Sequence, residues 1–432
     1  MIYWAQLLHF YQPPTQIPSM LRKICEESYS PLIDVFNDYP HARATINFNG
    51  VLTDMLYDCG HKHIIDGYRR LVASGQLEMT GSAMYHPILP LIPEEERMRQ
   101  IRINTGVNSR LFGSDIYNPK GFFPPEMCYS REIIPSIIQA GFEWIILGGI
   151  ACPDEWPVDE LYKTEQNGNS IAVFFRDDVL SNKISFQDLG PGEFIEHLVQ
   201  QRGERKDTYV VTAMDAETFG HHIQDWERSF LGAVYNELDP STETQEDFKQ
   251  TKVLANQHTV LLNSADVTTQ IQMVTMSELL GLFPVKKRGD PRPSSWSTTA
   301  EDIAADNPYP LWQDKNNEIH RLQWEHLGIC IDLVKKALEC ADNDESKRFA
   351  AISRRLLDRA EHSCQMWWAS HRPMWDINII HMGMIDQLRT VVNAFRAINK
   401  SGVDDKTKQE CYYLTVASRD IRSKFTDRLF VQ

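Results

Sequence analysis

Residues 210–222 read VVTAMDAETFGHH, an apolar run that stops at two acids, a glycine and two histidines. The length and composition of the apolar part, residues 210–214, favour a buried β-strand. In parallel α/β barrels the strands fill the core, and the loops at their carboxyl ends carry the chemistry. The stretch therefore predicts a barrel strand that ends at a reactive side chain, that of Asp215.

The first 285 residues repeat this pattern of short apolar runs between helix-length segments. Such alternation is typical of βα units around a parallel sheet. The further strand candidates are residues 2–8, 44–49, 77–87, 121–126, 144–147, 171–175 and 273–276. Helices are expected over residues 16–38, 52–71 and 93–112. The count of about seven or eight strands favours a barrel over an open sheet.

The final third of the chain has two different patterns. Residues 284–311 contain five prolines around the segment SSWSTT, which predicts an irregular but ordered connection. From residue 312 onward, hydrophobic residues recur about every 3.6 positions. This period predicts helices over residues 315–340, 346–369, 377–399 and 405–428. We expect three parts: a catalytic barrel at 1–285, a connecting loop at 286–311 and a helical domain at 312–432.

Composition and charge exclude several classes of function. With 432 residues and 42% hydrophobic side chains, the chain is expected to form a soluble barrel with an appended domain. Its formal net charge of −15 disfavours nucleic acid and anionic membranes as partners and suits a neutral substrate. Its eight cysteines form no Cys-x-x-Cys pair, so a zinc ribbon is not expected. We find neither a signal peptide nor an apolar run of about 18 residues, and we expect a cytoplasmic location.

Glu126 is the first candidate for chemistry. It ends the segment FFPPE, residues 122–126, at the end of a predicted strand. The two prolines make its backbone rigid, and apolar neighbours raise the pKa of a carboxyl group. These conditions suit a nucleophile, and the alternative is a surface glutamate at a turn.

The acids and histidines after residue 214 allow two interpretations. Asp215 and Glu217 are two residues apart, so on an extended backbone their side chains point the same way. Alternatively, Asp215, His221 and His222 contain the donor atoms of a metal site. Adjacent histidines in a strand face opposite sides, which disfavours the metal interpretation.

Two more histidines are expected at the same rim. His9 and His86 follow the first and third strand candidates. A single histidine in such a place is more often a structural hydrogen-bonding group. Several polar groups at one rim favour a functional site, because buried polar groups are costly unless they are paired or used.

Two acids at one rim suit a glycosidase that retains configuration. Such an enzyme needs two carboxyl groups about 5 Å apart, one to attack the anomeric carbon and one to transfer a proton. Aromatic side chains then provide flat apolar surfaces on which sugar rings stack. Trp296, Trp367 and Trp368 are the candidates for stacking, and a place in the core is the alternative for each.

With these residues the chain resembles glycoside hydrolase family 57, whose members act on α-glucans. Five motif regions have counterparts in the family's order: residues 9–13, 75–78 with 85–87, 121–126, 215–221 and 360–368. The resemblance implies an incomplete (β/α)7 barrel, followed by a helical bundle domain that contributes to the active-site cleft. It also implies that Glu126 is the nucleophile and that Asp215 is the general acid and base.

The resemblance further implies a substrate and the residues that bind it. The substrate is an α-glucan such as starch, glycogen or maltooligosaccharides, and neither a metal nor another cofactor is needed. The residues expected to bind sugar are His9, Gln12, Glu78, His86, Phe123, Glu217, His221, Trp296, Trp367 and Trp368. Three positions depart from the family pattern: Tyr11 replaces a histidine, Phe123 a tryptophan and Cys364 an acid.

We therefore expect a retaining hydrolase of the amylase or amylopullulanase type. The first alternative is a 4-α-glucanotransferase or a branching enzyme with the same site, because the sequence does not distinguish water from sugar as the acceptor. A metal-dependent polysaccharide deacetylase and an inactive glucan-binding protein are further alternatives.

Overall fold

The computed structural model describes residues 1–154, 156–240, 250–255, 258–263, 270–372 and 374–431. The chain divides into two compact units, called here the barrel unit and the helical unit. The barrel unit comprises Met1–Gln12, Gln16–Met84 and Leu89–Trp296. The helical unit comprises Pro13–Thr15, Tyr85–Ile88 and Ser297–Gln432. Two short segments from the first hundred residues, one of them carrying His86, thus belong to the helical unit.

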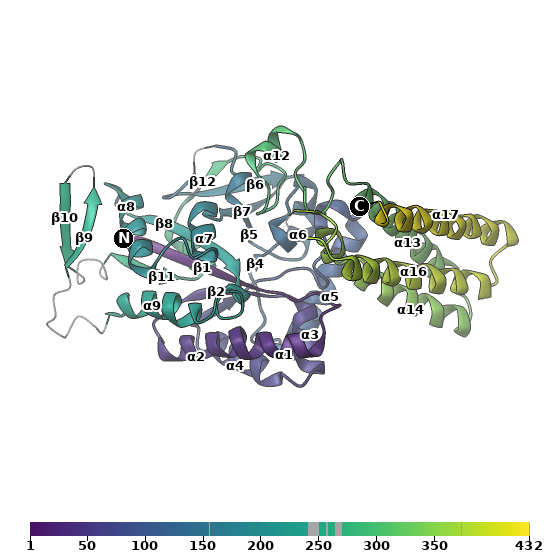
Figure 1. Ribbon diagram of the computed structural model, residues 1–432, viewed down its shortest axis with the longest axis horizontal. Coiled ribbons are helices and arrows are strands. Elements are labelled where there is room, and N and C mark those ends of the chain that lie inside the picture. The colour runs from purple at the N-terminus through teal and green to yellow at the C-terminus, as the bar shows by residue number, and fades with distance from the viewer. Residues whose placement is uncertain (155, 241–249, 256–257, 264–269, 373, 432) are drawn as a thin grey trace. The chain divides into compact units, whose positions relative to one another are not determined.

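Seven of the described parallel strands form the centre of the barrel unit, and an eighth, β11 (Ile271–Val274), pairs parallel with the first half of the first strand (Figure 1). The seven are β1 (Ile2–Phe10), β2 (Ala44–Phe48), β3 (Leu77–Met79), β4 (Gly121–Phe122), β5 (Trp144–Leu147), β7 (Asn169–Phe175) and β8 (Thr208–Asp215). Parallel ladders join them in two groups, β8-β1-β2-β3 and β4-β5-β7.

The two groups of strands meet at two places, called here the first and second seams, where a few backbone hydrogen bonds join them into a curled ring. At the first seam, the Gly81 nitrogen donates to the Gly121 oxygen at 2.8 Å, and the Phe123 nitrogen donates to the Gly81 oxygen at 2.9 Å. At the second seam, the Asp177 nitrogen donates to the Val211 oxygen at 2.8 Å. Isolated bonds replace full ladders at both seams. The predicted α/β class and incomplete (β/α)7 barrel are confirmed.

Alternate side chains of β1 fill two different cores, because successive residues of a strand face opposite sides. Trp4, Leu8 and Phe10 belong to the outer core, where the strands meet the surrounding helices. Ala5 and Leu7 belong to a separate inner core. Both faces of β1 are therefore buried, which explains its nearly continuous apolar sequence.

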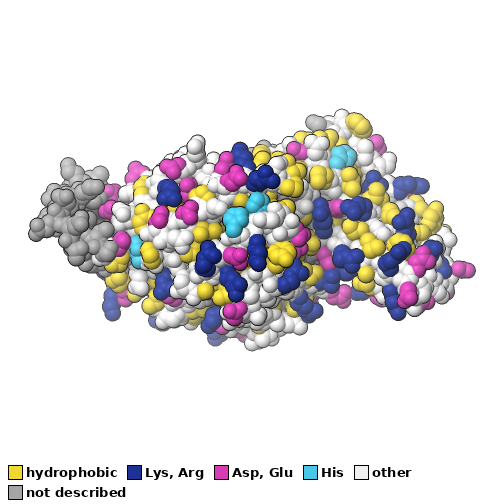
Figure 2. All heavy atoms as spheres, turned by 90° about the horizontal axis from the view of Figure 1, so that it is seen from below, with side chains coloured by type: hydrophobic (Ala, Val, Ile, Leu, Met, Phe, Trp, Pro, Cys, Tyr) yellow, Lys and Arg dark blue, Asp and Glu magenta, His cyan; other side chains and the backbone are white. Residues whose placement is uncertain are grey.

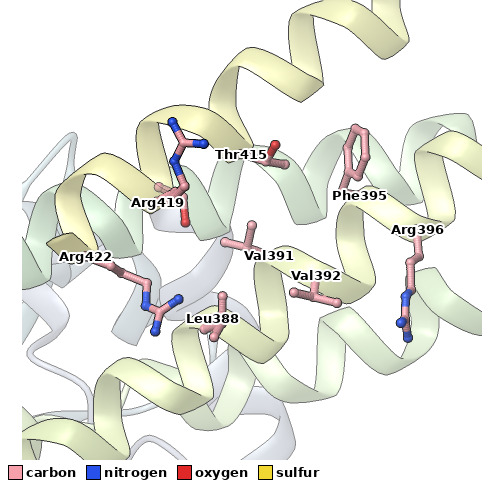
Figure 3. A pocket seen from close by; sticks show the side chains of 9 residues that line it. Leu388, Val391, Val392, Phe395, Arg396, Thr415, Arg419 and Arg422 are labelled. Atoms are coloured by element: carbon pink, nitrogen blue, oxygen red, sulfur yellow. The ribbon is translucent and has the colours of Figure 1, made fainter.

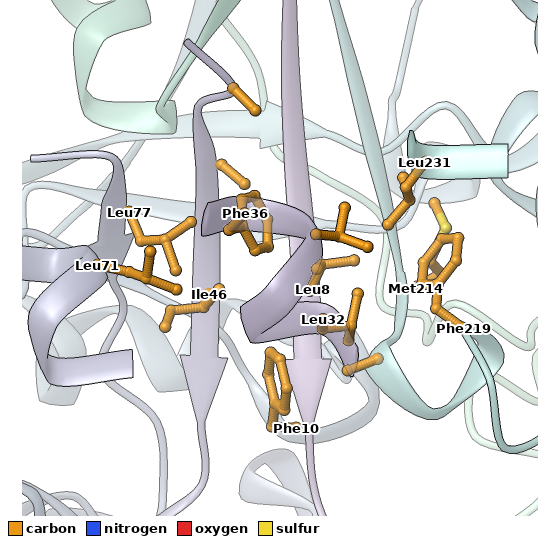
Figure 4. Close-up of a cluster of buried hydrophobic side chains, with 14 of the residues drawn as sticks. Leu8, Phe10, Leu32, Phe36, Ile46, Leu71, Leu77, Met214, Phe219 and Leu231 are labelled. Carbon is orange, nitrogen blue, oxygen red and sulfur yellow. The ribbon is translucent and has the colours of Figure 1, made fainter. Parts of the chain in front are cut away.

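The same alternation in β8 determines where Asp215 lies. Val210 and Met214 lie in the outer core, and Val211 and Ala213 lie in the inner core. Figure 4 shows Met214 together with side chains of β1, β2 and the covering helices. The next residue of the inner series is Asp215, the last residue of the strand.

The described helices of the barrel unit are α1 (Pro18–Ile24), α2 (Ser30–Asp38), α3 (Gly50–Asp58), α4 (Lys62–Ala73), α5 (Glu94–Phe112), α6 (Ile134–Gln139), α7 (Asp178–Ser185), α8 (Pro191–Arg202), α9 (Ala233–Glu237) and α11 (Met276–Leu282). The helix predicted over residues 16–38 contains a π-helical segment, η1 (Cys25–Tyr29), between α1 and α2. The single helix predicted over residues 52–71 is wrong. Gly60, with a φ of +84°, follows α3 and separates it from α4.

Five further strands lie among the described residues. They are β6 (Leu161–Gln166), β9 (Gln250–Ala255), β10 (His258–Asn263), β11 (Ile271–Val274) and β12 (Val285–Arg288). β6 runs antiparallel to β7, and β12 pairs with β6 inside the segment expected to be an irregular connection. That connection also holds α12 (Ala300–Ala304). The strand expected over residues 273–276 ends at Val274, because the capping box of Thr275 starts α11.

The helical unit contains the long helices that the 3.6-residue period predicts. They are α13 (Glu318–Cys340), α14 (Asp344–Ala360), α16 (Ile377–Lys400) and α17 (Asp405–Leu429). The helix predicted over residues 346–369 is wrong at its end, since α14 stops at Ala360 and a short helix α15 occupies Cys364–Trp367. In the described part of the chain, every long helix is too polar or too charged to cross a membrane.

A groove lies between α16 and α17 (Figure 3). Its volume is about 330 Å³, and Val391, Val392 and Phe395 contribute apolar side chains to its lining. Arg396, Arg419 and Arg422 also line it. Figure 2 shows Lys and Arg side chains among hydrophobic ones on one face of the helical unit.

The first seam generates a prediction about stability. A Cβ added at Gly121 would lie 1.9 Å from Cζ2 of Trp144, whose indole nitrogen donates to Ser277 Oγ at 2.8 Å. Because that bond holds the ring in place, Gly121→Ala is expected to lower the free energy of unfolding by about 1–3 kcal/mol. Urea unfolding measures this loss. The matched control is Gly192→Ala in α8, where an added Cβ meets no atom within 4 Å, and equal losses in both variants would contradict the prediction.

Candidate active site

The candidate active site lies at the carboxyl ends of β1 and β8 and just after β4. His9 and Asp215 are paired residues of the β1–β8 ladder, and Asn47 stands beside His9 in the β1–β2 ladder. Glu126 lies in a one-turn 3-10 helix, Pro125–Met127, with a φ of +58°. Non-glycine residues seldom adopt this left-handed conformation, and it is found often at functional positions.

Trp296 orients the carboxyl group of Glu126. Its Nε1 donates to the carboxyl oxygen Oε2 of Glu126 at 2.9 Å, and its backbone nitrogen donates to the backbone carbonyl oxygen of Glu126 at 3.2 Å. A hydrogen bond to a carboxylate favours the charged form of that group. Trp296 therefore supports Glu126 directly, and its use as a stacking surface for sugar stays a prediction.

Asp215 lies near a buried arginine that follows β7. Arg176 donates through Nε to the Ala213 oxygen at 2.7 Å, and through its terminal nitrogens to Asp178 Oδ1 and Asn182 Oδ1, each at 2.8 Å. Burial raises the pKa of Asp215 to about 6, and the positive charge of Arg176 opposes this rise. The guanidinium group thus connects β7 to β8 and moderates the charge at the end of β8.

Glu217 is a third carboxyl group beside Asp215. Its Oε1 accepts hydrogen bonds from Gln12 Nε2 at 2.9 Å and from the hydroxyl of Tyr29. Burial, and then the charge of Asp215, raise the pKa of Glu217 to about 8, while the two hydrogen bonds oppose the rise. Gln12 contacts Glu217 and Gln16, so here it orients a carboxyl group. Sugar binding by Gln12 and Glu217 stays a prediction.

The two predicted catalytic carboxyl groups interact electrostatically. Burial, and then the charge of Asp215, raise the pKa of Glu126 to about 8, and the bond from Trp296 opposes the rise. Burial thus raises the pKa of both carboxyl groups, and the charge of Asp215 adds to the rise at Glu126. The carboxyl separation of about 5 Å expected of a retaining enzyme stays a prediction.

His9 is held as a neutral imidazole. Its Nδ1 lies 2.7 Å from Asn47 Oδ1, and because a carbonyl oxygen only accepts, Nδ1 carries the proton. Burial lowers the pKa of His9 to about 4. Phe123 stacks on the imidazole with a centroid distance of 4.4 Å and an interplanar angle of 14°. Phe123 is fully buried, so it supports His9 and offers no open face in this structure.

The turn after Glu217 packs against η1. Gly220 has a φ of +102°, and an added Cβ would lie 1.9 Å from the Glu27 oxygen, so only glycine fits. Nδ1 of His221 lies 2.6 Å from Oε2 of Glu27. Over the described residues, no three His, Cys, Asp or Glu side chains are gathered as metal ligands. His221 is thus paired with Glu27, and its contact with sugar stays a prediction.

The carboxyl group of Glu78, in β3, accepts hydrogen bonds from β2 and from the start of α11. Oε2 of Glu78 accepts from Thr45 Oγ1 and from the Ser277 nitrogen, each at 3.1 Å, and Oε1 accepts from the Ser277 hydroxyl. Ser277 lies in the first turn of α11, where unpaired backbone N–H groups favour a carboxylate. These contacts support a structural role at the start of α11, and sugar binding by Glu78 stays a prediction.

Three predicted site residues belong to the helical unit. The strand predicted to end at His86 is wrong in its length, because β3 ends at Met79. His86 has a φ of +57° and is fully buried, with Nδ1 at 3.2 Å from Ser363 Oγ. Trp367 and Trp368 meet edge to face with a centroid distance of 5.0 Å. Both tryptophans are partly exposed. Their contribution to the cleft stays a prediction.

Sequence reasoning missed three polar residues that support the site: Asn47, Arg176 and Tyr29. Arg176 directly follows the apolar run 171–175, and Asn47 lies in the alternating segment 44–49. Both positions, in or just after a predicted strand, could have identified them as residues near the site. Tyr29 had none, because it lies within a helix-length segment.

The raised carboxyl pKa values predict that the site lowers stability at alkaline pH. A carboxyl group with a higher pKa in the folded state retains a proton that the unfolded chain releases. The contribution of the Glu126 carboxyl group to the free energy of unfolding is therefore intact below about pH 4.5 and is lost as the pH rises towards about 8. Glu126→Gln is expected to raise the free energy of unfolding at pH 8 by about 1–3 kcal/mol, with little change at pH 4.5.

Urea unfolding at both pH values measures this difference. The control is Glu204→Gln, at an exposed position after α8, which is expected to change neither value. Equal stabilisation by Glu126→Gln at both pH values would show that charge at this position is not the cause.

The chain matches one family model in a comparison with known proteins. The model of glycosyl hydrolase family 57 matches residues 5–257, more than half of the chain. The matched range includes Glu126 and Asp215 and ends before Trp296. The chain is 28% identical over 243 residues to an α-amylase from Pyrococcus horikoshii, a match that covers 54% of this chain and 37% of that protein.

Two further similarities extend the comparison. The chain is 26% identical over 243 residues to a 4-α-glucanotransferase from Thermococcus litoralis, which covers 52% of this chain and 35% of that protein. The crystal structure of that enzyme has the same fold, with a TM-score of 0.66 and 18% identity over 94% of this chain and 59% of the other. The chain thus spans little more than a third of either curated relative.

Proposed function

The chain belongs to glycosyl hydrolase family 57, and we propose that it acts on α-glucans with retention of configuration, using Glu126 as nucleophile and Asp215 as general acid and base. The predicted family is confirmed. The activity is supported by the names of the relatives, α-amylase and 4-α-glucanotransferase. The proposed substrates are starch, glycogen and maltooligosaccharides.

One observation carries the proposal: two buried carboxyl groups at one rim interact electrostatically, one of them oriented by a hydrogen bond and the other near a buried positive charge. Trp296 donates to Glu126, and Arg176 lies near Asp215. In the first step a Glu126 oxygen bonds to the anomeric carbon while the Asp215 proton moves to the departing oxygen. In the second, ionised Asp215 takes a proton from the acceptor hydroxyl, whose oxygen displaces Glu126.

The mechanism needs the proton on Asp215 and an ionised Glu126, whereas burial raises the pKa of Glu126 as well. Positive charge develops at the anomeric carbon in the transition state. Because this charge lies against Glu126, it stabilises the ionised form of that carboxyl group. The proton shared by the site is then expected on Asp215.

Azide tests both roles separately. With an α-maltosyl fluoride donor, Glu126→Ala is expected to give the β-glycosyl azide, because azide attacks directly from the side that the nucleophile occupied. Asp215→Ala is expected to give the α-glycosyl azide, because Glu126 still forms the covalent intermediate. Without azide, Asp215→Ala is expected to lose about 10²–10⁴-fold of its activity on glucan.

The anomeric configuration of the azide products, read by NMR, decides the assignment. The control Glu204→Gln should keep the activity of the unsubstituted protein. Opposite configurations would exchange the two roles, and full activity of Glu126→Ala on glucan would refute the proposal.

Transfer of glucan to a sugar acceptor is the second candidate, because one relative is named a 4-α-glucanotransferase. We propose hydrolysis as the main reaction of this chain. Incubation with maltoheptaose should then give only shorter products with free reducing ends. Products longer than seven glucose units would instead establish transfer, and new α-1,6 linkages would establish branching.

A further inference from the structure

One buried arginine is connected to both predicted catalytic acids. The guanidinium carbon of Arg176 lies over the Trp296 ring, 5.8 Å from its centroid, which is within the distance at which a cation is attracted to an aromatic face. Trp296 in turn donates to the carboxyl group of Glu126. The charge of the same guanidinium group also acts on Asp215. Arg176 thus interacts with one acid directly and with the other through an indole ring.

We propose that Arg176 is a positioning residue, which holds the indole of Trp296 in the direction that orients Glu126 and keeps a positive charge near Asp215. The inference rests on the proposed function, in which Glu126 is the nucleophile and Asp215 the general acid and base. Arg176 itself touches neither substrate nor the reacting atoms in this account.

Three hydrogen bonds fix the direction of the guanidinium group. Nε of Arg176 donates to the Ala213 oxygen in β8 at 2.7 Å, and the terminal nitrogens donate to Asp178 and Asn182 in α7, each at 2.8 Å. The side chain is only 4% exposed. Because a guanidinium group is planar and its donors form a rigid fork, partners in two elements determine its plane. A lysine ammonium group carries the charge without this planar geometry.

The indole of Trp296 is held by contacts of two kinds. His9 and Phe123 meet it edge to face, with centroid distances of 5.9 Å and 5.8 Å. Arg176 adds an electrostatic attraction to the ring face. The Trp296 side chain is partly exposed, so its direction depends on these neighbours more than that of a fully enclosed ring would. Loss of the guanidinium group should therefore weaken the hydrogen bond from the indole to Glu126.

Described titratable groups face the two acids from β1, from the turns after the acids and from α7: they are His9, Cys128, Glu217 and Asp178. Burial lowers the pKa of His9 to about 4 and raises that of Cys128 well above its usual range, so both are neutral near pH 7. Glu217 interacts with Asp215, and Asp178 is paired with Arg176. Of the groups named here, Arg176 alone carries a permanent positive charge.

Arg176→Gln is expected to move the whole pH profile of kcat/KM on maltooligosaccharides upward by about half to one pH unit. Loss of the positive charge raises the pKa of Asp215, and a weaker bond from Trp296 raises the pKa of Glu126, since both contacts oppose the rise caused by burial. The two changes have the same sign, so the profile moves upward whichever acid determines each limb. A purely structural defect would lower the rate by one factor at every pH.

Arg176→Lys separates the charge from the geometry. Because the charge is kept, its pH profile should move less than half as far as that of Arg176→Gln. Its kcat/KM at the optimum should still fall about 10-fold, because the indole loses its fixed direction. Trp296→Phe removes the donor to Glu126 and should lose at least as much. Adding Arg176→Lys to Trp296→Phe should then cause little further loss, because the proposed effect on Glu126 passes through the indole.

The matched control is Arg97→Gln. Arg97 also donates to backbone oxygens of the barrel unit, to Ile92 through Nε at 2.9 Å and to Glu132 through a terminal nitrogen at 2.6 Å. Its removal should move neither the pH profile nor the rate at the optimum.

An unmoved profile in Arg176→Gln, or fully additive losses from Arg176→Lys and Trp296→Phe, would overturn the inference. If Arg176→Gln does not fold, the additivity of the other two variants decides alone. Inactivity of the unsubstituted protein on maltooligosaccharides is a different result, because it would refute the proposed function.

Discussion

The parallel pairing of β1 with β8 is the constraint on which the site depends. The ladder runs from Ile2 with Thr208 to His9 with Asp215, and each strand alternates between an outer and an inner core. Because both faces are buried, a shift of one residue would exchange the two cores and turn the rim residues outward. The packing of eight residue pairs thus determines which polar side chains stand at the end of the strands.

Charge is the second constraint, since Asp215 interacts electrostatically with two other buried carboxyl groups, those of Glu126 and Glu217, and with the guanidinium group of Arg176. Burial raises the pKa of all three carboxyl groups. The hydrogen bonds from Trp296 to Glu126, and from Tyr29 and Gln12 to Glu217, offset part of that rise. Stability and the proposed reactivity are therefore opposed here, because the carboxyl groups that reduce folding stability at neutral pH include the two proposed to catalyse the reaction.

Much of the fold could be predicted from the sequence, because burial on both faces leaves an apolar run that is hard to mistake, as in 171–175. The predicted helix boundaries were wrong where a single residue determines the backbone conformation, as Gly60 does between α3 and α4. Glu126 and Asp215 could be proposed from their places after strands. Tyr29 could not, because a π-helical turn leaves the apolar period nearly unchanged while it redirects side chains. Likewise, the sequence gives no sign of the contact between Glu78 and Ser277, because the two residues are far apart in the chain and only the fold brings them together.

The two seams give the ring a property that a continuous barrel lacks. Asp215 ends a strand of the β8-β1-β2-β3 group, whereas Glu126 follows the β4-β5-β7 group, and isolated bonds at Gly81 and Asp177 join the groups. The separation of Asp215 and Glu126 therefore depends on how the two groups of strands pair with each other. A change in the few backbone bonds at Gly81 or Asp177 would therefore alter the separation of Asp215 and Glu126 while the ladders within each group stay intact.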